Sequence, residues 1–419
     1  MKIKRFLSVA LALMGGVAMY AQTSPYTGST VQAGDEFYLY NVESNMWLQE
    51  NNRFTADWNT RGGLGTVGFD VRLISIDGGW QIDPKFGHNN SMNGSNFYLD
   101  TSDGVTAWTF EPADVEGVSN AYRIKYNGEF LHATPSPEFK LIRNNVEERH
   151  TWQVITRADR LAYMETATEE DPKDGSWLIR ANEFTHEDTR KTANWTFSGS
   201  SNVNWNGGRF EADNRQNSVF ESWGLSNMSL TQTITGLPNG KYKVSARACY
   251  SPTAADGMNE TDLAAYNNGT LENHGFLFAN DETAPLKSVY SWQGTEAYLH
   301  YHSKNLGGTY VIDGVNQFSY TVQNDADAYY NEVEVIIIDG ILKLGVKVEN
   351  ANGKAWVMAD KFRLTYLGPV EIDLSEYKDA LETAITDAEA FSGNTTDILQ
   401  ANLDAALAAA KGAREVGLQ

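Results

Sequence analysis

The stretch GLPNGKYKVSARACY, residues 236–250, constrains the fold of this chain more than any other feature. Pro238, Asn239 and Gly240 are three turn-forming residues in a row. After them, apolar residues alternate with Lys, Ser and Arg, and the preceding SLTQTITGL alternates in the same way. A period of two is the pattern of a strand with one buried side. The sequence therefore predicts a β-layer with one solvent-facing side, entered through a tight turn.

Aromatic residues and glycines are abundant along the whole chain. Its 419 residues include 11 Trp, 20 Tyr, 18 Phe and 36 Gly, and helical periodicity is confined to the C-terminal end. This composition favours β-sandwiches and barrels. The length exceeds that of a single core, so we predict a mainly β protein of two or three domains.

The N-terminus, MKIKRFLSVALALMGGVAMYAQ, has basic residues, then an apolar run, then small Ala21. This is the pattern of a secretory signal peptide, residues 1–21, and the run is too short to span a membrane. We therefore expect export to the cell surface or exterior, with the periplasm left open. Cys249 is the only cysteine, so no intrachain disulfide forms, and it suits a small apolar strand position.

The formal net charge is −21. Binding to nucleic acid requires clustered Lys and Arg, so this charge argues against it. A neutral ligand or a cation is the more natural partner, although an acidic surface also serves simply to keep a protein soluble. No later stretch is long and apolar enough to span a membrane.

Residues 33–160 contain three similar passages of roughly 40 residues each. Each has an aromatic–Leu strand (Tyr38–Leu39, Tyr98–Leu99, Phe130–Leu131), and two have a Trp in the closing strand (Trp108, Trp152). The arrangement resembles a β-trefoil of the ricin-like lectin kind. We favour a core role for Trp108 and Trp152 over sugar contact.

Residues 164–176 are acidic and polar, which predicts a linker between two independently folded units. A second β unit follows over residues 173–368. Asp339–Gly340 predicts a hairpin between strands 332–338 and 341–348, and the polar stretch 251–274 predicts a surface insertion.

The last segment, residues 373–416, has helical spacing and predicts a helical hairpin. Leu374, Tyr377 and Leu381 recur along the first helix, Asp373 and Glu376 suit a capping box, and Gly393 ends it. Two helices with one apolar stripe each need a third helix or a neighbouring domain to cover them. The chain is therefore either part of a longer protein or depends on docking.

Four passages of the second unit occur in a characteristic order: MSLTQTITGLPNGKYKVSARACYS, LFANDETAPL, VEVIIIDGILKLGVKV and WVMADKFRLTYLG. They resemble the galactose-binding-like jelly-roll modules of secreted Bacteroidetes proteins, which are related to carbohydrate-binding modules. The resemblance implies a β-sandwich jelly roll over residues 173–368 that binds glycans or polysaccharides and is not itself catalytic.

Sugar rings pack on Trp and Tyr, while Asn, Arg and acidic side chains satisfy sugar hydroxyls. Trp205 lies in a loop-like stretch beside Asn204, Arg209 and Glu211, and either ligand contact or a core position fits it. Trp223 alternates like a strand residue, which favours the core. The resemblance adds Asn352 and Trp356, which lie in and just after the loop before the last strand.

Related modules often hold a structural Ca²⁺ between their first and last strands, which implies Glu183 and Asp360 as ligands. A surface role for these acids is the competing interpretation. Family members commonly have Asp–Asn before the final Phe–Arg–Leu, whereas Lys361 follows Asp360 here. His300 and His302 share a strand face but have no adjacent third zinc ligand.

Three functions remain compatible with the sequence. The first is a secreted, non-catalytic carbohydrate-binding protein. The second is a structural or adhesive surface protein that binds another protein. The third, which we disfavour, is a glycoside hydrolase or lyase with two carboxylates across a cleft. The glycan and the oligomeric state have no sequence signal.

Overall fold

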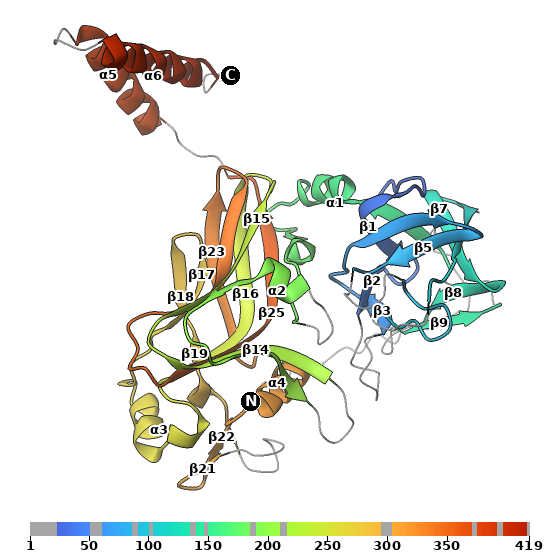
Figure 1. The fold of residues 1–419 in the computed structure, drawn as a ribbon, viewed down its shortest axis with the longest axis horizontal. Helices are drawn as coiled ribbons and strands as arrows, with labels where there is room; N and C mark the ends of the chain where they lie inside the picture. The colour runs from blue at the N-terminus through green and yellow to red at the C-terminus, as the bar shows by residue number, and fades with distance from the viewer. Residues whose placement is uncertain are drawn as a thin grey trace, which may run out of the picture. The chain divides into compact units, whose positions relative to one another are not determined.

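The computed structural model describes residues 23–50, 61–85, 91–99, 104–134, 140–145, 150–184, 190–209, 216–294, 304–370, 375–391 and 397–416. The chain forms two compact units, one ending at Pro369 and the other comprising Val370–Gln419. Strands dominate the first unit and helices the second, so the mainly β fold class is confirmed (Figure 1). The predicted signal peptide lies outside the described residues.

Ten strands form one sheet in the first part of the chain. The sheet path is β3-β2-β1-β10-β7-β8-β9, with β4, β5 and β6 alongside. An isolated bridge between Gly63 and Lys140 joins its two ends. The strands are β1 (Gly34–Asn41), β2 (Met46–Glu50), β3 (Gly62–Gly65), β4 (Val71–Ile76), β5 (Gly79–Asp83), β6 (Thr109–Val115), β7 (Val118–Tyr126), β8 (Glu129–Ala133), β9 (Leu141–Asn144) and β10 (Trp152–Thr156).

Trp108 and Trp152 are fully buried in this sheet, as the core interpretation predicted. The indole Nε1 of Trp108 donates to the Met92 carbonyl at 3.1 Å, and that of Trp152 donates to the Leu131 carbonyl at 3.0 Å. Burying an indole requires such a partner. The trefoil arrangement itself stays a prediction.

Residues 164–176 connect the two β parts, and a few side chains of this predicted linker are packed against them. Helix α1 (Arg157–Met164) starts at the capping box of Thr156 and Asp159. Met164 and Ala167 are buried, and β11 (Lys173–Asp174) pairs with the last strand of the sandwich. The segment is polar in composition because it buries only a few apolar side chains while its acids face solvent. Its role as a boundary between independently folded units stays a prediction.

The chain has two β parts, the ten-stranded sheet and the strands that follow from residue 173. A cationic side chain among three aromatic rings lies where these two parts meet. Arg160 of α1 is buried, and its guanidinium carbon lies 3.8, 4.4 and 4.6 Å from the ring centroids of Trp47, Trp177 and Tyr38. These rings belong to one hydrophobic cluster that continues into the sandwich. The two β parts therefore share a core within one compact unit.

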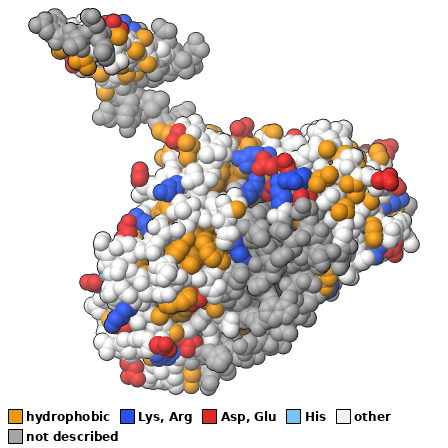
Figure 2. All heavy atoms as spheres, viewed as in Figure 1, with side chains coloured by type: hydrophobic (Ala, Val, Ile, Leu, Met, Phe, Trp, Pro, Cys, Tyr) orange, Lys and Arg blue, Asp and Glu red, His pale blue; other side chains and the backbone are white. Residues whose placement is uncertain are grey.

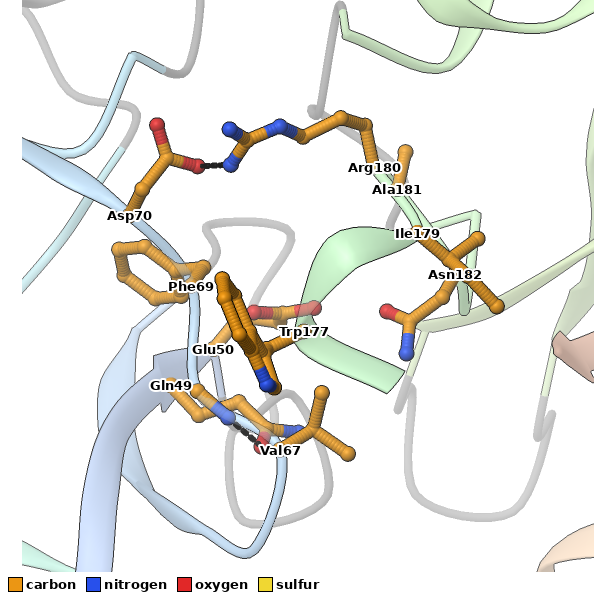
Figure 3. Close-up of a pocket in the computed structure, with 11 residues that line it drawn as sticks. Gln49, Glu50, Val67, Phe69, Asp70, Trp177, Ile179, Arg180, Ala181 and Asn182 are labelled. Carbon is orange, nitrogen blue, oxygen red and sulfur yellow. Dashed lines mark hydrogen bonds and ion pairs between the residues drawn. The ribbon is translucent and has the colours of Figure 1, made fainter. Parts of the chain in front are cut away.

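Ion pairs reinforce this junction. Arg180 and Asp70 point toward one another from the two β parts (Figure 3). Arg180 also pairs with Glu36, and Lys85 pairs with Asp70 at 2.5 Å. Asp70 is buried, so each of its charge contacts is shielded from water and worth more than a surface pair.

The remaining strands build a two-sheet sandwich (Figure 1). Leu230, Val244, Leu277, Leu344 and Val357 are all fully buried in the cluster between the sheets. One sheet contains β11, β13 (Val203–Arg209), β14 (Gln216–Leu225), β16 (Gly240–Ser251), β19 (Lys287–Ser288), β23 (Tyr330–Ile337) and β25 (Ala355–Gly368). The other contains β12 (Thr196–Ser198), β15 (Met228–Thr235), β17 (Gly275–Ala279), β18 (Glu282–Pro285) and β24 (Ile341–Val348).

Strand β16 alternates as predicted only in its first half. Beyond Val244, every residue except Arg247 is buried. Two segments that follow β16 supply the cover. Helix α3 (Glu260–Asn267), within the predicted insertion, and helix α4 (Val315–Asn324), after β19, contribute to an apolar cluster with Cys249 and Met358. A three-stranded sheet of β20 (Gln293–Gly294), β21 (Lys304–Leu306) and β22 (Thr309–Val311) lies between β19 and α4 in the chain.

The predicted hairpin at Asp339–Gly340 is wrong. Strand β23 pairs with β16, and β24 pairs with β15 and β17, so the turn carries the chain from one sheet to the other. The turn is held from outside, because Asn239 Oδ1 accepts from Gly340 N–H at 3.1 Å and the Gly340 carbonyl accepts from Leu237 N–H at 3.1 Å. Local turn chemistry does not specify which strands pair.

The second unit contains the two predicted helices, α5 (Ser375–Ala390) and α6 (Asp397–Val416). Lys411 of α6 pairs with Glu389 of α5 at 2.5 Å. Asp373 and Leu374 lie outside the described residues. Among the helices that the structure describes, none combines the length and the apolar character needed to cross a bilayer.

Candidate functional site

The candidate site lies at one end of the sandwich, where β14 finishes and β25 begins. The 350–354 loop is fastened to the turn after β14: Gly353 N–H donates to the Leu225 carbonyl at 3.1 Å, and Ala351 N–H donates to the Ser226 carbonyl at 2.9 Å. Trp223 and Trp356 are direct cross-strand partners just before this connection. The predicted residues Trp223 and Trp356 are therefore neighbours, and Asn352 lies at the same end of the sandwich.

A carboxylate that the sequence analysis missed organises this face. Glu221 pairs across strands with Asn204, and its Oε1 accepts from Trp356 Nε1 at 2.9 Å. Burial raises the pKa of Glu221, against hydrogen bonds from Trp356 and Asn204 that lower it. The period of two across β14 was the available signal, because it places Glu221 on the same face as Trp223.

The core position expected for Trp223 is wrong, and the structure favours the core side of the two alternatives for Trp205. Trp205 lies in strand β13 rather than in a loop and is half-buried, with its ring centroid 5.2 Å from Phe220 and 6.2 Å from Phe184. Trp223 has an exposed fraction of 36%, whereas Trp356 is buried at 3%. Trp223 is therefore the aromatic surface that this face presents to solvent.

A pocket of about 260 Å³ with mixed polar and apolar lining opens at the same end of the sandwich. His274 is held there, with Nε2 3.4 Å from Glu272 Oε2 and Nδ1 3.1 Å from the Glu349 carbonyl. The wall thus offers an imidazole, a carboxylate and an amide to a hydroxylated ligand. Its lining includes Tyr250, Pro252, Thr270, Glu272, His274 and Asn352.

The structure does not describe the side chains of several residues with predicted ligand-binding or metal-binding roles. Arg209 belongs to β13, but its side chain is not among the described ones, and Glu211 lies outside the described residues. His300 and His302 also lie outside them. Their roles stay predictions.

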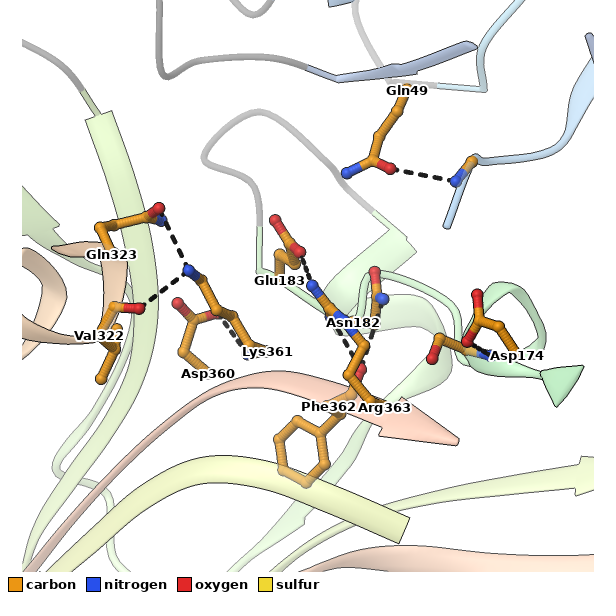
Figure 4. Close-up of polar contacts among 12 residues, drawn as sticks. Gln49, Asp174, Asn182, Glu183, Val322, Gln323, Asp360, Lys361, Phe362 and Arg363 are labelled. Atoms are coloured by element: carbon orange, nitrogen blue, oxygen red, sulfur yellow. Dashed lines mark hydrogen bonds and ion pairs between the residues drawn. The ribbon is translucent and has the colours of Figure 1, made fainter. Parts of the chain in front are cut away.

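The predicted calcium ligands are surrounded by cationic side chains (Figure 4). Glu183 forms an ion pair with Arg363. Burial tends to raise the pKa of Glu183, but the charges of Arg363 and Lys361 outweigh it and lower the pKa. Burial raises the pKa of Asp360 to about 8, so this fully buried carboxyl favours its protonated form at neutral pH.

A third ligand is missing beside Glu183 and Asp360 in the described part of the chain. Among the described residues, no group of three or more His, Cys, Asp or Glu side chains is arranged to hold a metal.

Comparisons with known proteins found only weak structural similarities. No family model and no curated protein matches the chain. Among solved structures, TmCBM61 in complex with β-1,4-galactotriose is 15% identical, with 45% of this chain and 97% of that chain covered and a TM-score of 0.22. A structure of carbohydrate-binding modules from the β-sandwich superfamily is 8% identical, with 70% and 96% covered and a TM-score of 0.21.

A β-glucosidase from Kluyveromyces marxianus in complex with glucose is 11% identical. The match covers 66% of this chain and 20% of that chain, with a TM-score of 0.14. TM-scores this low do not establish a shared fold.

Proposed function

We propose that this protein is an exported, non-catalytic carbohydrate-binding protein whose sandwich takes a neutral glycan at the Trp223 face. The observation that carries the proposal is an exposed indole beside a fixed carboxylate. Trp223 gives a flat apolar surface for a sugar ring, and Glu221, held by Trp356 and Asn204, offers an acceptor to its hydroxyls. A hydrogen-bonded carboxylate loses little freedom on binding.

The negative charge of the protein favours a neutral ligand over an acidic one. The formal net charge is −21, and Glu221 would repel an acidic sugar placed on Trp223. On the face drawn in Figure 2, basic side chains lie singly or next to acidic ones instead of forming a continuous basic surface. Among the described side chains of this face, a polyanion would find no extended basic surface.

Export is part of the proposal and rests on the sequence of residues 1–21. N-terminal sequencing of the secreted protein should start at Gln22. Secreted material that still begins at Met1 would refute cleavage.

The binding test compares three variants on an array of neutral and acidic oligosaccharides. We expect Trp223→Ala to weaken binding of the best neutral oligosaccharide at least tenfold with an unchanged melting temperature, because stacking contributes about 0.5–1.5 kcal/mol beyond area burial. Trp205→Ala should instead lower stability by about 3 kcal/mol through a cavity. Ile338→Ala, exposed at 63%, is the matched surface control.

Two results would reject the proposal: silence across the array, or Trp223→Ala binding like the parent protein. Release of shortened sugars from the bound oligosaccharide would reject the non-catalytic part.

A protein partner is the second candidate, because three isoleucines lie exposed near the crossing between the sheets. Ile336, Ile338 and Ile341 have exposed fractions of 51%, 63% and 43%. Two results would favour this function: no glycan binding on the array, and a partner protein that the parent protein captures but an Ile336→Ser/Ile338→Ser variant does not.

A further inference from the structure

The resemblance to carbohydrate-binding modules implies a structural Ca²⁺ near Glu183 and Asp360, and the residues present do not fit that ion. Ca²⁺ requires six to eight oxygen ligands, several of them anionic. Glu183 already binds Arg363. Asp360 Oδ1 accepts from the Lys361 backbone N–H at 2.7 Å, and its Oδ2 is buried without a hydrogen-bond partner among the described residues.

The oxygens that would suit a cation are gathered around an ammonium group instead. Lys361 Nζ donates to the carbonyl of Val322 at 3.0 Å and to Gln323 Oε1 at 3.2 Å. Both acceptors are neutral oxygens at the end of α4, of the kind that Ca²⁺ also uses. Figure 4 shows the Lys361 side chain extending from β25 toward them.

The backbone orients this ammonium. Lys361 has a φ of +50°, in the left-handed region that few residues other than Gly and Asn adopt. The β16–β25 register shifts between Ser245 and Arg247, directly opposite. The irregularity turns the Lys361 side chain toward α4, which a regular strand would not do.

Electrostatics also argue against adding a divalent ion. Glu183 is already paired with Arg363, and Lys361 and Arg247, the cross-strand neighbour of Asp360, add two further cations. A Ca²⁺ at this place would have to displace the Glu183–Arg363 pair and the Lys361 hydrogen bonds together. Each loss leaves a poorly solvated charge, which is costly.

We infer that the Lys361 ammonium takes the place of the structural cation, so that this sandwich is calcium-independent and Lys361 is the residue that excludes calcium. In this view Lys361 ties α4 to β25 as a bound ion would. The inference concerns stability and metal binding, and it does not depend on the proposed glycan site.

The test follows thermal unfolding of the full chain in CaCl₂ and in EDTA, with calorimetric titration of CaCl₂ alongside. The parent protein should melt at the same temperature in both and give no heat of Ca²⁺ binding. Lys361→Asn keeps a residue that tolerates positive φ and restores Asp–Asn. It should melt lower in EDTA and regain stability in CaCl₂.

Lys354→Asn, at an exposed loop position before β25, is the matched control and should respond like the parent. A calcium-dependent melting temperature or binding heat in the parent protein would overturn the inference. So would a Lys361→Asn variant that folds but ignores calcium, because Lys361 would then not be the excluding group.

Discussion

Two imidazoles lie against each other inside the first β part. His150 is buried at 1% exposure, its Nδ1 is 3.2 Å from Nδ1 of His132, and its ring stacks on Phe130. One of the two nitrogens must donate and the other accept, so the ring that accepts must be neutral. Burial, then the neighbouring His132 and Arg123, lower the pKa of His150 to about 4.

We expect this pair to make the protein sensitive to acid. The unfolded chain binds a proton on His150 near its ordinary pKa of about 6.5, whereas the folded protein resists protonation until about pH 4. Stability is therefore complete above about pH 6.5 and falls by up to about 3 kcal/mol as the pH drops to about 4. Urea unfolding of the parent and of His150→Gln across this range measures it.

The acid sensitivity should be smaller in His150→Gln, although carboxylates elsewhere contribute to both proteins. An equal loss of stability in the two proteins would show that His150 titrates normally in the fold.

At the same scale, Trp205 and Trp223 show what sequence spacing leaves open. Both lie in strands, so alternation assigns each to one side of a sheet without saying what covers that side. Phe184 and Phe220 cover Trp205, while the edge of the face at Trp223 stays open. Asn and Gly neighbours indicated a loop at Trp205, but they lie in a paired strand with an irregular register.

At the scale of the secondary-structure elements, the pairing of β24 with both of its neighbours depends on one glycine. Gly345 lies opposite Thr231 of β15 and Phe278 of β17, with a φ of +156°. A Cβ added there would lie 1.8 Å from the Leu230 carbonyl oxygen. Only glycine allows β24 to pair with both neighbours at this point.

Gly345→Ala should therefore cost at least about 1–3 kcal/mol of stability, the usual range for a strained backbone position. Gly269→Ala is the control, because Gly269 also has a positive φ, but a methyl group added there would meet nothing within 4 Å among the described residues. Equal stability losses in the two variants, measured by thermal unfolding, would mean that the chain relaxes around residue 345.

On the scale of the whole molecule, the two β parts should unfold together. Arg160 with its surrounding aromatic rings and the Arg180–Asp70 ion pair join the two parts. Met164 and Ala167 of the connecting segment are themselves buried. We expect calorimetry to give one transition for both parts, and limited proteolysis to leave residues 164–176 uncut.

Arg160→Ala tests this junction, since it removes the cation from three rings and leaves a cavity. Cleavage within 164–176 should appear in this variant and not in Lys354→Ala. Cleavage of the parent protein in that segment, or two separate transitions, would show two independent units.

The sequence alone determined the features that depend on neighbours along the chain. A period of two placed β15 and β16, turn residues placed the break between them, and helical spacing placed α5 and α6. Pairing across sheets, burial of Trp205 and packing of 164–176 were decided only by the tertiary structure. These depend on which distant surfaces meet, because an alternating strand fits many partners equally well until a shared core selects one.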